Sequence, residues 1–296
     1  MNVYVVTPCF NAGDVIDRTV ASVLLQSGDV DIHYHVQDGG SDDDTVERVK
    51  RWIGLCERGD LPLMCRSVTM TMASESDAGM YDAIFRSFER QMPLSRDWMT
   101  WINAGDVLTP SACPLLVRVE FDEGLRHQVH WLTGAAATSA NDVQTSHSDR
   151  FHSSEIIEKG LADGRHWHFV QQEGTFFRGE LWNSVDIRDG FAGLRRAGDW
   201  NLWRMFAELE EIHQFRYPLG TFAFAEGQQS QALRSEYESE ISGIVPEEHR
   251  RDAFYALDAD ELVARFLRPE LRSAELHLDR VSATNAYKFI RGKLEL

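Results

Sequence analysis

The stretch Trp98-Met99-Thr100-Trp101-Ile102-Asn103-Ala104-Gly105-Asp106 joins an apolar run to a turn of small residues that presents one carboxylate. An apolar run of this length, bounded by turn residues, is typical of a buried strand. Gly105 lets the backbone approach a ligand closely, and Asp106 offers the hard oxygen ligands that divalent cations prefer. The turn therefore predicts a binding site at the end of a strand.

Three other polar loops follow apolar runs earlier in the chain. They lie at Asn11, Asp38 and Asp77, and each precedes a segment whose apolar residues recur with helical spacing. Strands that alternate with helices predict a doubly wound α/β sheet, in which ligands bind outside the carboxyl ends of the strands. We therefore expect the four loops to meet at one edge of a mainly parallel sheet.

The pattern of alternating strands and helices is lost after about Val129, and charged amphipathic segments follow residue 230. We expect a main domain over residues 1–230 and a helical C-terminal appendage over residues 231–296. The 296 residues carry 30 basic and 47 acidic side chains, for a net charge of −17. A charge of this sign opposes binding to nucleic acid or to a bare anionic membrane, so no nucleic-acid partner is expected.

The four cysteines are widely spaced and include no Cys-x-x-Cys pair, which argues against a zinc ribbon or a disulfide framework. The first residues lack the basic start and long apolar run of a signal peptide, and no window has the length of a membrane span. The sequence thus predicts a cytoplasmic protein. Its basic and apolar segment Tyr287-Lys-Phe-Ile-Arg-Gly-Lys leaves open peripheral contact with the inner face of the membrane.

Four motifs occur in order along the first 106 residues: Thr7-Pro-Cys-Phe-Asn-Ala, Val36-Gln-Asp-Gly-Gly-Ser-Asp-Asp-Asp-Thr, Ser74-Glu-Ser-Asp-Ala-Gly-Met-Tyr-Asp-Ala and Trp101-Ile-Asn-Ala-Gly-Asp. In order and spacing they resemble the motifs of inverting family 2 glycosyltransferases with the GT-A fold. The resemblance continues at Gln171-Gln-Glu-Gly-Thr-Phe-Phe-Arg and Ala197-Gly-Asp-Trp-Asn-Leu-Trp, and so covers about residues 1–230. It implies an α/β fold with a Rossmann-like mixed, mainly parallel sheet flanked by helices.

The resemblance also assigns roles to particular residues. Asp199 matches the family's general base, and Asp106 matches the acidic position that holds a divalent cation, Mn²⁺ or Mg²⁺, against the diphosphate. The nucleotide and the rest of the donor would lie against Thr7, Pro8, Phe10, Asn11, Asp38, Glu75, Asp77, Asn103, Ala104 and Gly105. In that arrangement Asp38 accepts hydrogen bonds from the base, while Glu75 and Asp77 face the ribose or the sugar.

Two positions depart from the family's pattern. Asn103 stands where some relatives carry an acid, so Asp106 is the only carboxylate of its motif, and Asp77 or a downstream histidine would complete the cation's shell. Gly198 stands where many relatives carry a glutamate, so the base lacks an acidic neighbour. A lone carboxylate needs burial or hydrogen bonding to adjust its pKa. Asp38, Asp106 and Asp199 also have a simpler interpretation as turn or helix-start residues.

The resemblance implies a metal-dependent, inverting enzyme of cell-surface polysaccharide synthesis. It would move a sugar from a UDP-, GDP- or dTDP-linked donor to a hydroxyl group of a saccharide or lipid-linked acceptor. The two departures favour, as an alternative, a catalytically silent sugar-nucleotide binding or scaffold protein. A nucleotidyltransferase would need a basic, glycine-rich triphosphate loop near the N-terminus, and none is visible in the sequence.

Overall fold

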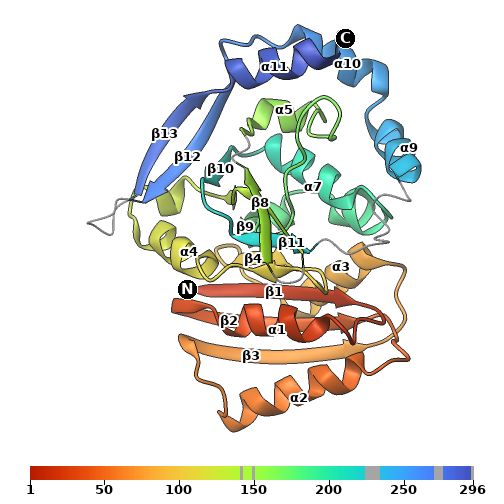
Figure 1. The fold of residues 1–296 in the computed structure, drawn as a ribbon, viewed down its shortest axis with the longest axis vertical. Coiled ribbons are helices and arrows are strands. Elements are labelled where there is room, and N and C mark those ends of the chain that lie inside the picture. Colours follow the sequence, from red (N-terminus) through yellow and green to blue (C-terminus); the bar gives the residue numbers. More distant parts are fainter. Residues whose placement is uncertain (141–142, 149–150, 224–233, 270–275, 295–296) are drawn as a thin grey trace.

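The computed structural model describes residues 1–140, 143–148, 151–223, 234–269 and 276–294. Its N-terminal part alternates strands and helices, as the sequence predicts (Figure 1). The strands are β1 (Asn2–Cys9), β2 (Ser27–Asp38), β3 (Met64–Ser74) and β4 (Trp98–Trp101). The helices between them are α1 (Ile16–Leu24), α2 (Thr45–Arg58) and α3 (Met80–Gln91).

The middle of the chain contributes shorter elements. They are β5 (Val107–Leu108), α4 (Ala112–Phe121), η1 (Leu125–His127), β6 (Trp131–Thr133), β7 (Ala136–Ala140), β8 (Val143–Ser148), α5 (Ser154–Glu158), β9 (Phe176–Arg178), α6 (Gly179–Asn183), η2 (Arg188–Ala192), α7 (Gly198–Ala207), β10 (Ile212–Phe215) and β11 (Gly220–Ala223). The C-terminal part adds α9 (Arg234–Ile244), α10 (Glu247–Ala256), β12 (Val263–Pro269), β13 (Leu276–Ser282) and α11 (Thr284–Leu294).

Within the described ranges the main sheet has nine strands in the order β13-β12-β10-β6-β9-β4-β1-β2-β3. The strands β4, β1, β2 and β3 run parallel to one another. β9 pairs antiparallel with both β4 and β6, so the sheet is mixed. A smaller sheet has the order β5-β11-β7-β8. The predicted α/β class with a mixed, mainly parallel sheet is therefore confirmed.

The central strands are buried on both faces because helices cover each side of the sheet. All four residues of β4 are buried, as expected for a strand at the centre of a sheet. Trp101 at the end of β4 stacks on Trp203 of α7, with 5.4 Å between ring centroids, and Trp203 stacks in turn on Trp131 of β6 at 5.8 Å. This aromatic packing fixes α7 against the strand that leads to Asp106.

The C-terminal segment contains the strands β12 and β13 in addition to the helices α9, α10 and α11. β12 pairs parallel with β10 and antiparallel with β13, and it thereby extends the main sheet. The reason is a two-residue alternation in β12, where Ala264 and Phe266 are buried and Val263 and Arg265 are partly exposed. The sheet thus continues past residue 230, and the division into two domains stays a prediction.

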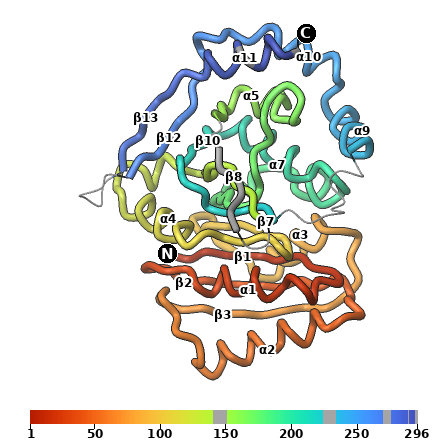
Figure 2. The backbone as a smooth tube through the Cα atoms, viewed as in Figure 1, coloured from red at the N-terminus to blue at the C-terminus, as the bar shows by residue number. Residues whose placement is uncertain are grey.

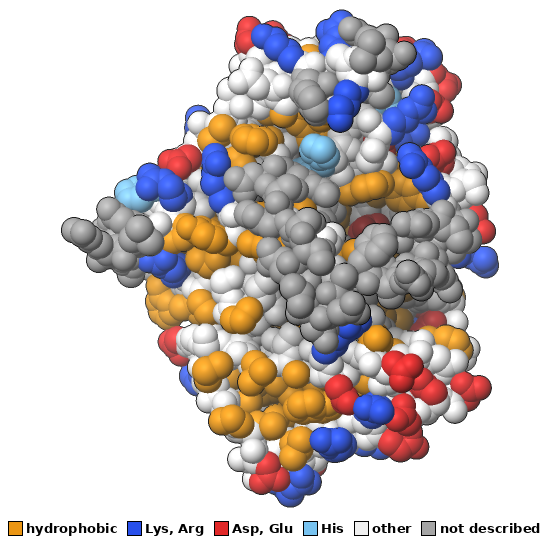
Figure 3. All heavy atoms as spheres, viewed as in Figure 1, with side chains coloured by type: hydrophobic (Ala, Val, Ile, Leu, Met, Phe, Trp, Pro, Cys, Tyr) orange, Lys and Arg blue, Asp and Glu red, His pale blue; other side chains and the backbone are white. Residues whose placement is uncertain are grey.

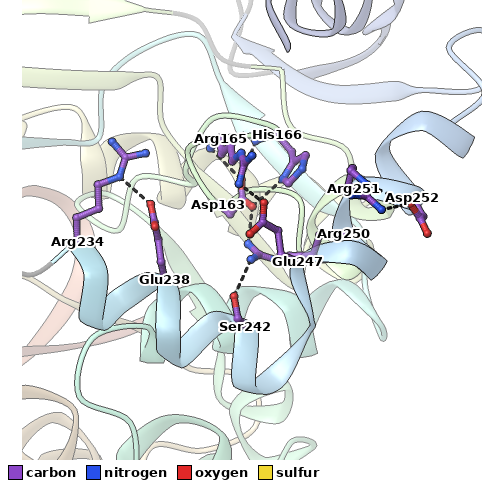
Figure 4. A network of polar contacts seen from close by, with 10 residues as sticks. All are labelled: Asp163, Arg165, His166, Arg234, Glu238, Ser242, Glu247, Arg250, Arg251 and Asp252. Carbon is purple, nitrogen blue, oxygen red and sulfur yellow. Dashed lines mark hydrogen bonds and ion pairs between the residues drawn. The ribbon is translucent and has the colours of Figure 1, made fainter. Parts of the chain in front are cut away.

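A buried charge network fastens α10 to the core (Figure 4). Asp163 accepts hydrogen bonds from Arg250 Nη1 at 2.6 Å and from His166 Nδ1 at 2.9 Å. The exposed fraction of these three side chains is only 1–5%. Burial raises the pKa of Asp163, but the hydrogen bonds from His166 and the neighbouring backbone outweigh it, and the pKa lies below its ordinary value. The ionised carboxylate therefore holds α10 in place.

The backbone trace runs from the N-terminal strands at one end of the molecule to the C-terminal helices at the other (Figure 2). The middle of the chain lies between these two ends, over β4 and β9. None of the helices in the described ranges has the length and apolar character needed to cross a bilayer.

Candidate functional site

A cavity of about 670 Å³ opens where β1 and β4 end. Seven of the predicted residues contribute to its lining, namely Pro8, Phe10, Asn11, Asp77, Asn103, Ala104 and Asp106. The loops after β1, β3 and β4 thus converge at one edge of the sheet, as parallel strands require. Acidic side chains gather near the same edge of the surface (Figure 3).

The other predicted residues lie outside this cavity. The Thr7 side chain is fully buried, with its hydroxyl oxygen 2.9 Å from Tyr34 Oη. Glu75 forms ion pairs with Arg86 and Arg90 of α3. Gly105 lines a second cavity, of about 470 Å³. The roles expected of these residues toward the donor stay predictions.

Asp38 organises the loop after β2. Its buried carboxylate accepts hydrogen bonds from Ser74 Oγ at 2.6 Å, from the backbone N–H groups of Gly40 and Ser41 at 3.1 and 3.0 Å, and from the Ser41 hydroxyl. Burial raises the pKa of Asp38, but these hydrogen bonds outweigh it and hold the pKa below its ordinary 3.8. The carboxylate is therefore ionised and directed into its own loop.

Asp106 lies in a turn that α1 holds in place. Thr19 Oγ1 of α1 donates a hydrogen bond to Asp106 O and accepts one from Gly105 N, each at 2.8 Å. The Asp106 side chain is only 4% exposed, and its Oδ1 accepts a hydrogen bond from Ala223 N at 2.8 Å. Burial raises the pKa of Asp106 to about 6.

Glu173, in the loop before β9, pairs directly with Asp106. Glu173 is 8% exposed, and its carboxyl group hydrogen-bonds to that of Asp106. Burial and the Asp106 charge raise the pKa of Glu173 well above its ordinary value. Glu173 lies in the motif Gln171-Gln-Glu-Gly-Thr-Phe-Phe-Arg, but no role was predicted for it. The sequence feature that could have indicated one is an acid directly before a glycine. In the structure this glycine, Gly174, has a φ of 84° and forms a tight turn.

The residues at this end of β4 fit a divalent cation. The Asp106 and Glu173 carboxyl groups supply only oxygen ligands, which Mg²⁺ and Mn²⁺ prefer. Among the described residues, Asn103 Oδ1 is a buried oxygen that has no hydrogen-bond partner. No group of three or more His, Cys, Asp or Glu residues placed to hold a metal occurs in the described part of the chain. The structure places Glu173 in contact with Asp106, while Asp77 lies elsewhere in the lining of the same cavity.

Asp199 lies in the first turn of α7 and is held by α3. Tyr81 Oη donates a hydrogen bond to Asp199 Oδ1 at 2.9 Å and lies 3.1 Å from Arg196 O. Burial raises the pKa of Asp199, and the Tyr81 hydrogen bond only partly offsets it. Asp199 also interacts electrostatically with Glu173, which connects it to the Asp106 turn. A carboxylate with a raised pKa is a stronger base than a solvated one.

The glycine at position 198 has a structural reason. A Cβ added to Gly198 would lie 2.7 Å from both Cγ and Cδ2 of the Tyr81 ring. The ring therefore occupies the space that any side chain at position 198 would need. Tyr81, which the sequence analysis did not select, takes the place of an acidic neighbour and contacts Asp199 directly.

Residues 4–65, which span most of β1 and all of α1, β2 and α2 up to the start of β3, match the family model described as glycosyl transferase family 2. The match covers less than half of the chain, so it shows a similarity to this family in the N-terminal part. The search of proteins of curated function found no match. The matched residues include the loops after β1 and β2, which carry Asn11 and Asp38.

The fold of the chain resembles that of solved GT-A glycosyltransferases. S. aureus TarS 1-349 in complex with UDP-GlcNAc is 14% identical, with a TM-score of 0.55, over 86% of this chain and 70% of that one. The mannosyltransferase PcManGT from Pyrobaculum calidifontis, in complex with GDP-Man and Mn²⁺, is 14% identical, with a TM-score of 0.50, over 86% and 74% of the two chains. The chain covers only 42% of a longer structure of S. aureus TarS. These likenesses establish the GT-A fold.

Proposed function

We propose that the protein is an inverting glycosyltransferase that moves a sugar from a nucleoside-diphosphate donor to a hydroxyl group of a saccharide or lipid-linked acceptor. The observation that carries this proposal is the cavity at the strand ends, which Asp106 lines. The buried Glu173 carboxyl group interacts with Asp106 and also with Asp199, in the first turn of α7. The family match and the nucleotide-sugar complexes of the similar folds support a donor of this class.

Asp106 and Glu173 would hold a divalent cation together with oxygens of the donor's diphosphate, because magnesium-type sites commonly combine few protein carboxylates with substrate phosphates. When bound, such a cation stabilises the negative charge that builds on the leaving diphosphate. Asn103 Oδ1 is a further oxygen beside this turn. Cation binding without a nucleotide should be weak, since two protein carboxyl groups leave most of the shell to the donor and water.

Asp199 would accept the proton of the acceptor hydroxyl group. As that oxygen forms its bond to the anomeric carbon, the bond from this carbon to the diphosphate breaks on the opposite face, and the nucleoside diphosphate leaves. The attack from the opposite face inverts the configuration of the anomeric carbon. Tyr81 holds the Asp199 carboxylate in one orientation through its 2.9 Å hydrogen bond. Burial keeps Asp199 basic enough to act near neutral pH.

Asp199 lines a small pocket with the aromatic residues Phe169, Trp200 and Trp203. This pocket has a volume of only about 10 Å³, room for no more than a water molecule, so an acceptor would reach Asp199 from outside it. From the family resemblance we propose a saccharide acceptor, free or attached to a lipid, and a role in cell-surface polysaccharide synthesis. Such an enzyme would work in the cytoplasm or at the inner face of the membrane.

A binding and turnover experiment tests this function. Thermal shifts with UDP, GDP and dTDP should show stabilisation by one base, larger with Mn²⁺ than without it, because a ligand of the folded state raises its apparent stability. Asp106→Asn should abolish the Mn²⁺ dependence. Asp199→Asn should keep the thermal shift but lower turnover of the matching nucleotide sugar by about 10²–10⁴-fold. Asp60→Asn, an exposed residue at the end of α2, is the matched control and should behave as wild type.

Three results would overturn the proposal. Binding of no nucleoside diphosphate would remove the donor assignment, and a Mn²⁺ effect that persists in Asp106→Asn would remove the cation from this turn. Tight nucleotide-sugar binding with no turnover, across saccharide acceptors and water, would identify the silent binding protein instead.

A further inference from the structure

Helix α9, from the C-terminal segment, packs against the start of α7. Ile241 of α9 is 1% exposed and forms one apolar cluster with Ala197 and Trp200, the residues that flank Gly198 and Asp199. In Figure 1, α9 lies along the outer side of the molecule next to α7. A segment that the sequence analysis treated as an appendage thus contacts the helix that carries the proposed base.

Glu240, next to Ile241 in the sequence, binds the backbone that leads into α7. Its Oε1 accepts a hydrogen bond from Arg195 N at 2.8 Å, and its Oε2 accepts one from Arg196 N at 2.8 Å and one from Ala197 N at 2.7 Å. Three backbone N–H groups on one carboxylate form a compact anion site of the kind found at turns before helices.

This arrangement fixes the backbone directly before α7. The residue at the N-cap of α7 is Ala197, which has no side chain able to accept a hydrogen bond, and no side-chain cap is present there. Without Glu240, the N–H groups of residues 195–197 would lose their carboxylate acceptor. The backbone that leads into the first turn of α7 would then no longer be held in one position. Asp199 lies only two residues beyond Ala197, so its position depends directly on this segment.

We propose that Glu240 is a positioning residue for Asp199, which orients the first turn of α7 and keeps the Asp199 carboxylate in its reactive environment. This inference rests on the proposed function of Asp199 as the general base. Glu240 does not touch the reacting atoms. It acts through the backbone of residues 195–197 and through its own charge.

The groups that face Asp199 come from three parts of the structure. Tyr81 of α3 donates a hydrogen bond to it, Glu173 faces it from the loop before β9, and Glu240 and Tyr237 face it from α9. Burial raises the pKa of Asp199, the Tyr81 hydrogen bond lowers it, and the Glu240 charge raises it further. The Tyr237 hydroxyl is buried and has no hydrogen-bond partner among the described residues. α9 therefore supplies both a charge and a polar group on this side of the base.

The test compares Glu240→Gln with two related variants. Glu236→Gln is the matched control, because Glu236 lies one turn earlier on α9 and, among the described residues, binds the Arg196 side chain, at 3.1 Å from Nε, and not the backbone before α7. Glu240→Asp keeps the charge but shortens the side chain. The first readouts need no substrate: amide hydrogen exchange of residues 195–197, and the pKa of Asp199 by ¹³C NMR of its carboxyl carbon, assigned with Asp199→Asn. The last readout is hydrolysis of UDP-GlcNAc with Mn²⁺ as a function of pH.

In Glu240→Gln we expect faster amide exchange at residues 195–197 and a lower Asp199 pKa. We also expect a kcat for hydrolysis reduced about tenfold with KM for UDP-GlcNAc unchanged, because a small displacement of the base slows the chemical step rather than donor binding. Glu240→Asp should move the Asp199 pKa back toward that of the wild type, and Glu236→Gln should leave exchange and kcat at wild-type values.

An unchanged Asp199 pKa and unchanged amide exchange in Glu240→Gln would refute the positioning role, whatever the activity. If wild type hydrolyses UDP-GlcNAc and Asp199→Asn does not, a wild-type kcat in Glu240→Gln refutes the role and leaves the proposed function intact. If wild type neither binds nor hydrolyses any nucleotide sugar, the proposed function fails, and the NMR and exchange results alone decide whether Glu240 positions Asp199.

Discussion

Replacing Gly198 with alanine would push a methyl group into the ring of Tyr81. The added Cβ would lie 2.7 Å from Cγ and Cδ2 of the ring, whereas carbon atoms in contact normally stay about 3.5–4.0 Å apart. The ring has little room to move, because its hydroxyl is bound to Asp199 at 2.9 Å and its ring centroid lies 4.9 Å from that of Phe191. The overlap of about 1 Å must be relieved by a shift of α7 or α3.

The size of the effect follows from two opposing contributions. Inserting a methyl group into a packed site costs about 1–3 kcal/mol, while alanine gains at most about 1 kcal/mol over glycine inside a helix. Gly198 is the first residue of α7, where the helix-forming gain is smaller than in the interior. We therefore expect Gly198→Ala to lower the free energy of unfolding by about 1–2 kcal/mol.

Urea denaturation of a double-mutant cycle measures the free-energy cost of the overlap between a side chain at position 198 and Tyr81. Gly198→Ala should be costly in the wild-type background and nearly neutral in Tyr81→Ala, which removes Cγ together with the ring. The matched control is Gly243→Ala in α9, where an added Cβ meets no atom within 4 Å, and this variant should be neutral or slightly stabilising. An equal loss of stability in both backgrounds, or no loss in either, would refute the argument that the Tyr81 ring excludes a side chain at position 198.

Three further predictions concern neighbouring groups. Tyr81→Phe removes a hydrogen bond that favours ionised Asp199, so the Asp199 pKa should rise and the acidic limb of the kcat profile for donor hydrolysis should move to higher pH. Arg250→Met leaves the Asp163 carboxylate buried without its cation, and urea denaturation should show a loss of about 3–5 kcal/mol. Glu173→Gln removes one of the two buried carboxyl groups at the end of β4, and calorimetry should show Mn²⁺ binding to the UDP complex weakened about 10-fold or more.

The N-terminal half of the fold could be predicted because its signals are local. β1 and β4 are apolar runs, β2 and β3 alternate apolar and polar residues, and each of these strands ends in a polar loop. β9 gives no such signal, since it has only three residues and takes its place by pairing with Trp98 and Met99, far away in the sequence. The strand β12 was missed because its charged residues suggested an exposed helix.

The site was predictable in part, and the rest depends on tertiary contacts. Asp106 and Asp199 follow from motif resemblance, but Tyr81 reaches Asp199 across 118 residues of sequence and Glu240 reaches Ala197 across 43. No local pattern connects such positions. Asp38 differs, because its motif is clear in the sequence but the direction of its side chain is not. The hydrogen bonds of the structure show that its carboxylate points into its own loop.

The environments of Asp106 and Asp199 suit them to different chemistry. Burial raises the pKa of both, and Asp106 also interacts with the buried Glu173 carboxyl group, which supplies further oxygen atoms for a cation. Asp199 instead accepts hydrogen bonds from Tyr81 Oη and from the Trp200 backbone, which orient its carboxylate at the start of α7. Glu173 interacts electrostatically with both acids, so substitutions at Asp106 and Asp199 should not be additive in their effect on stability. Glu173, which we propose as a cation ligand, thus couples the cation side of the proposed reaction to the base.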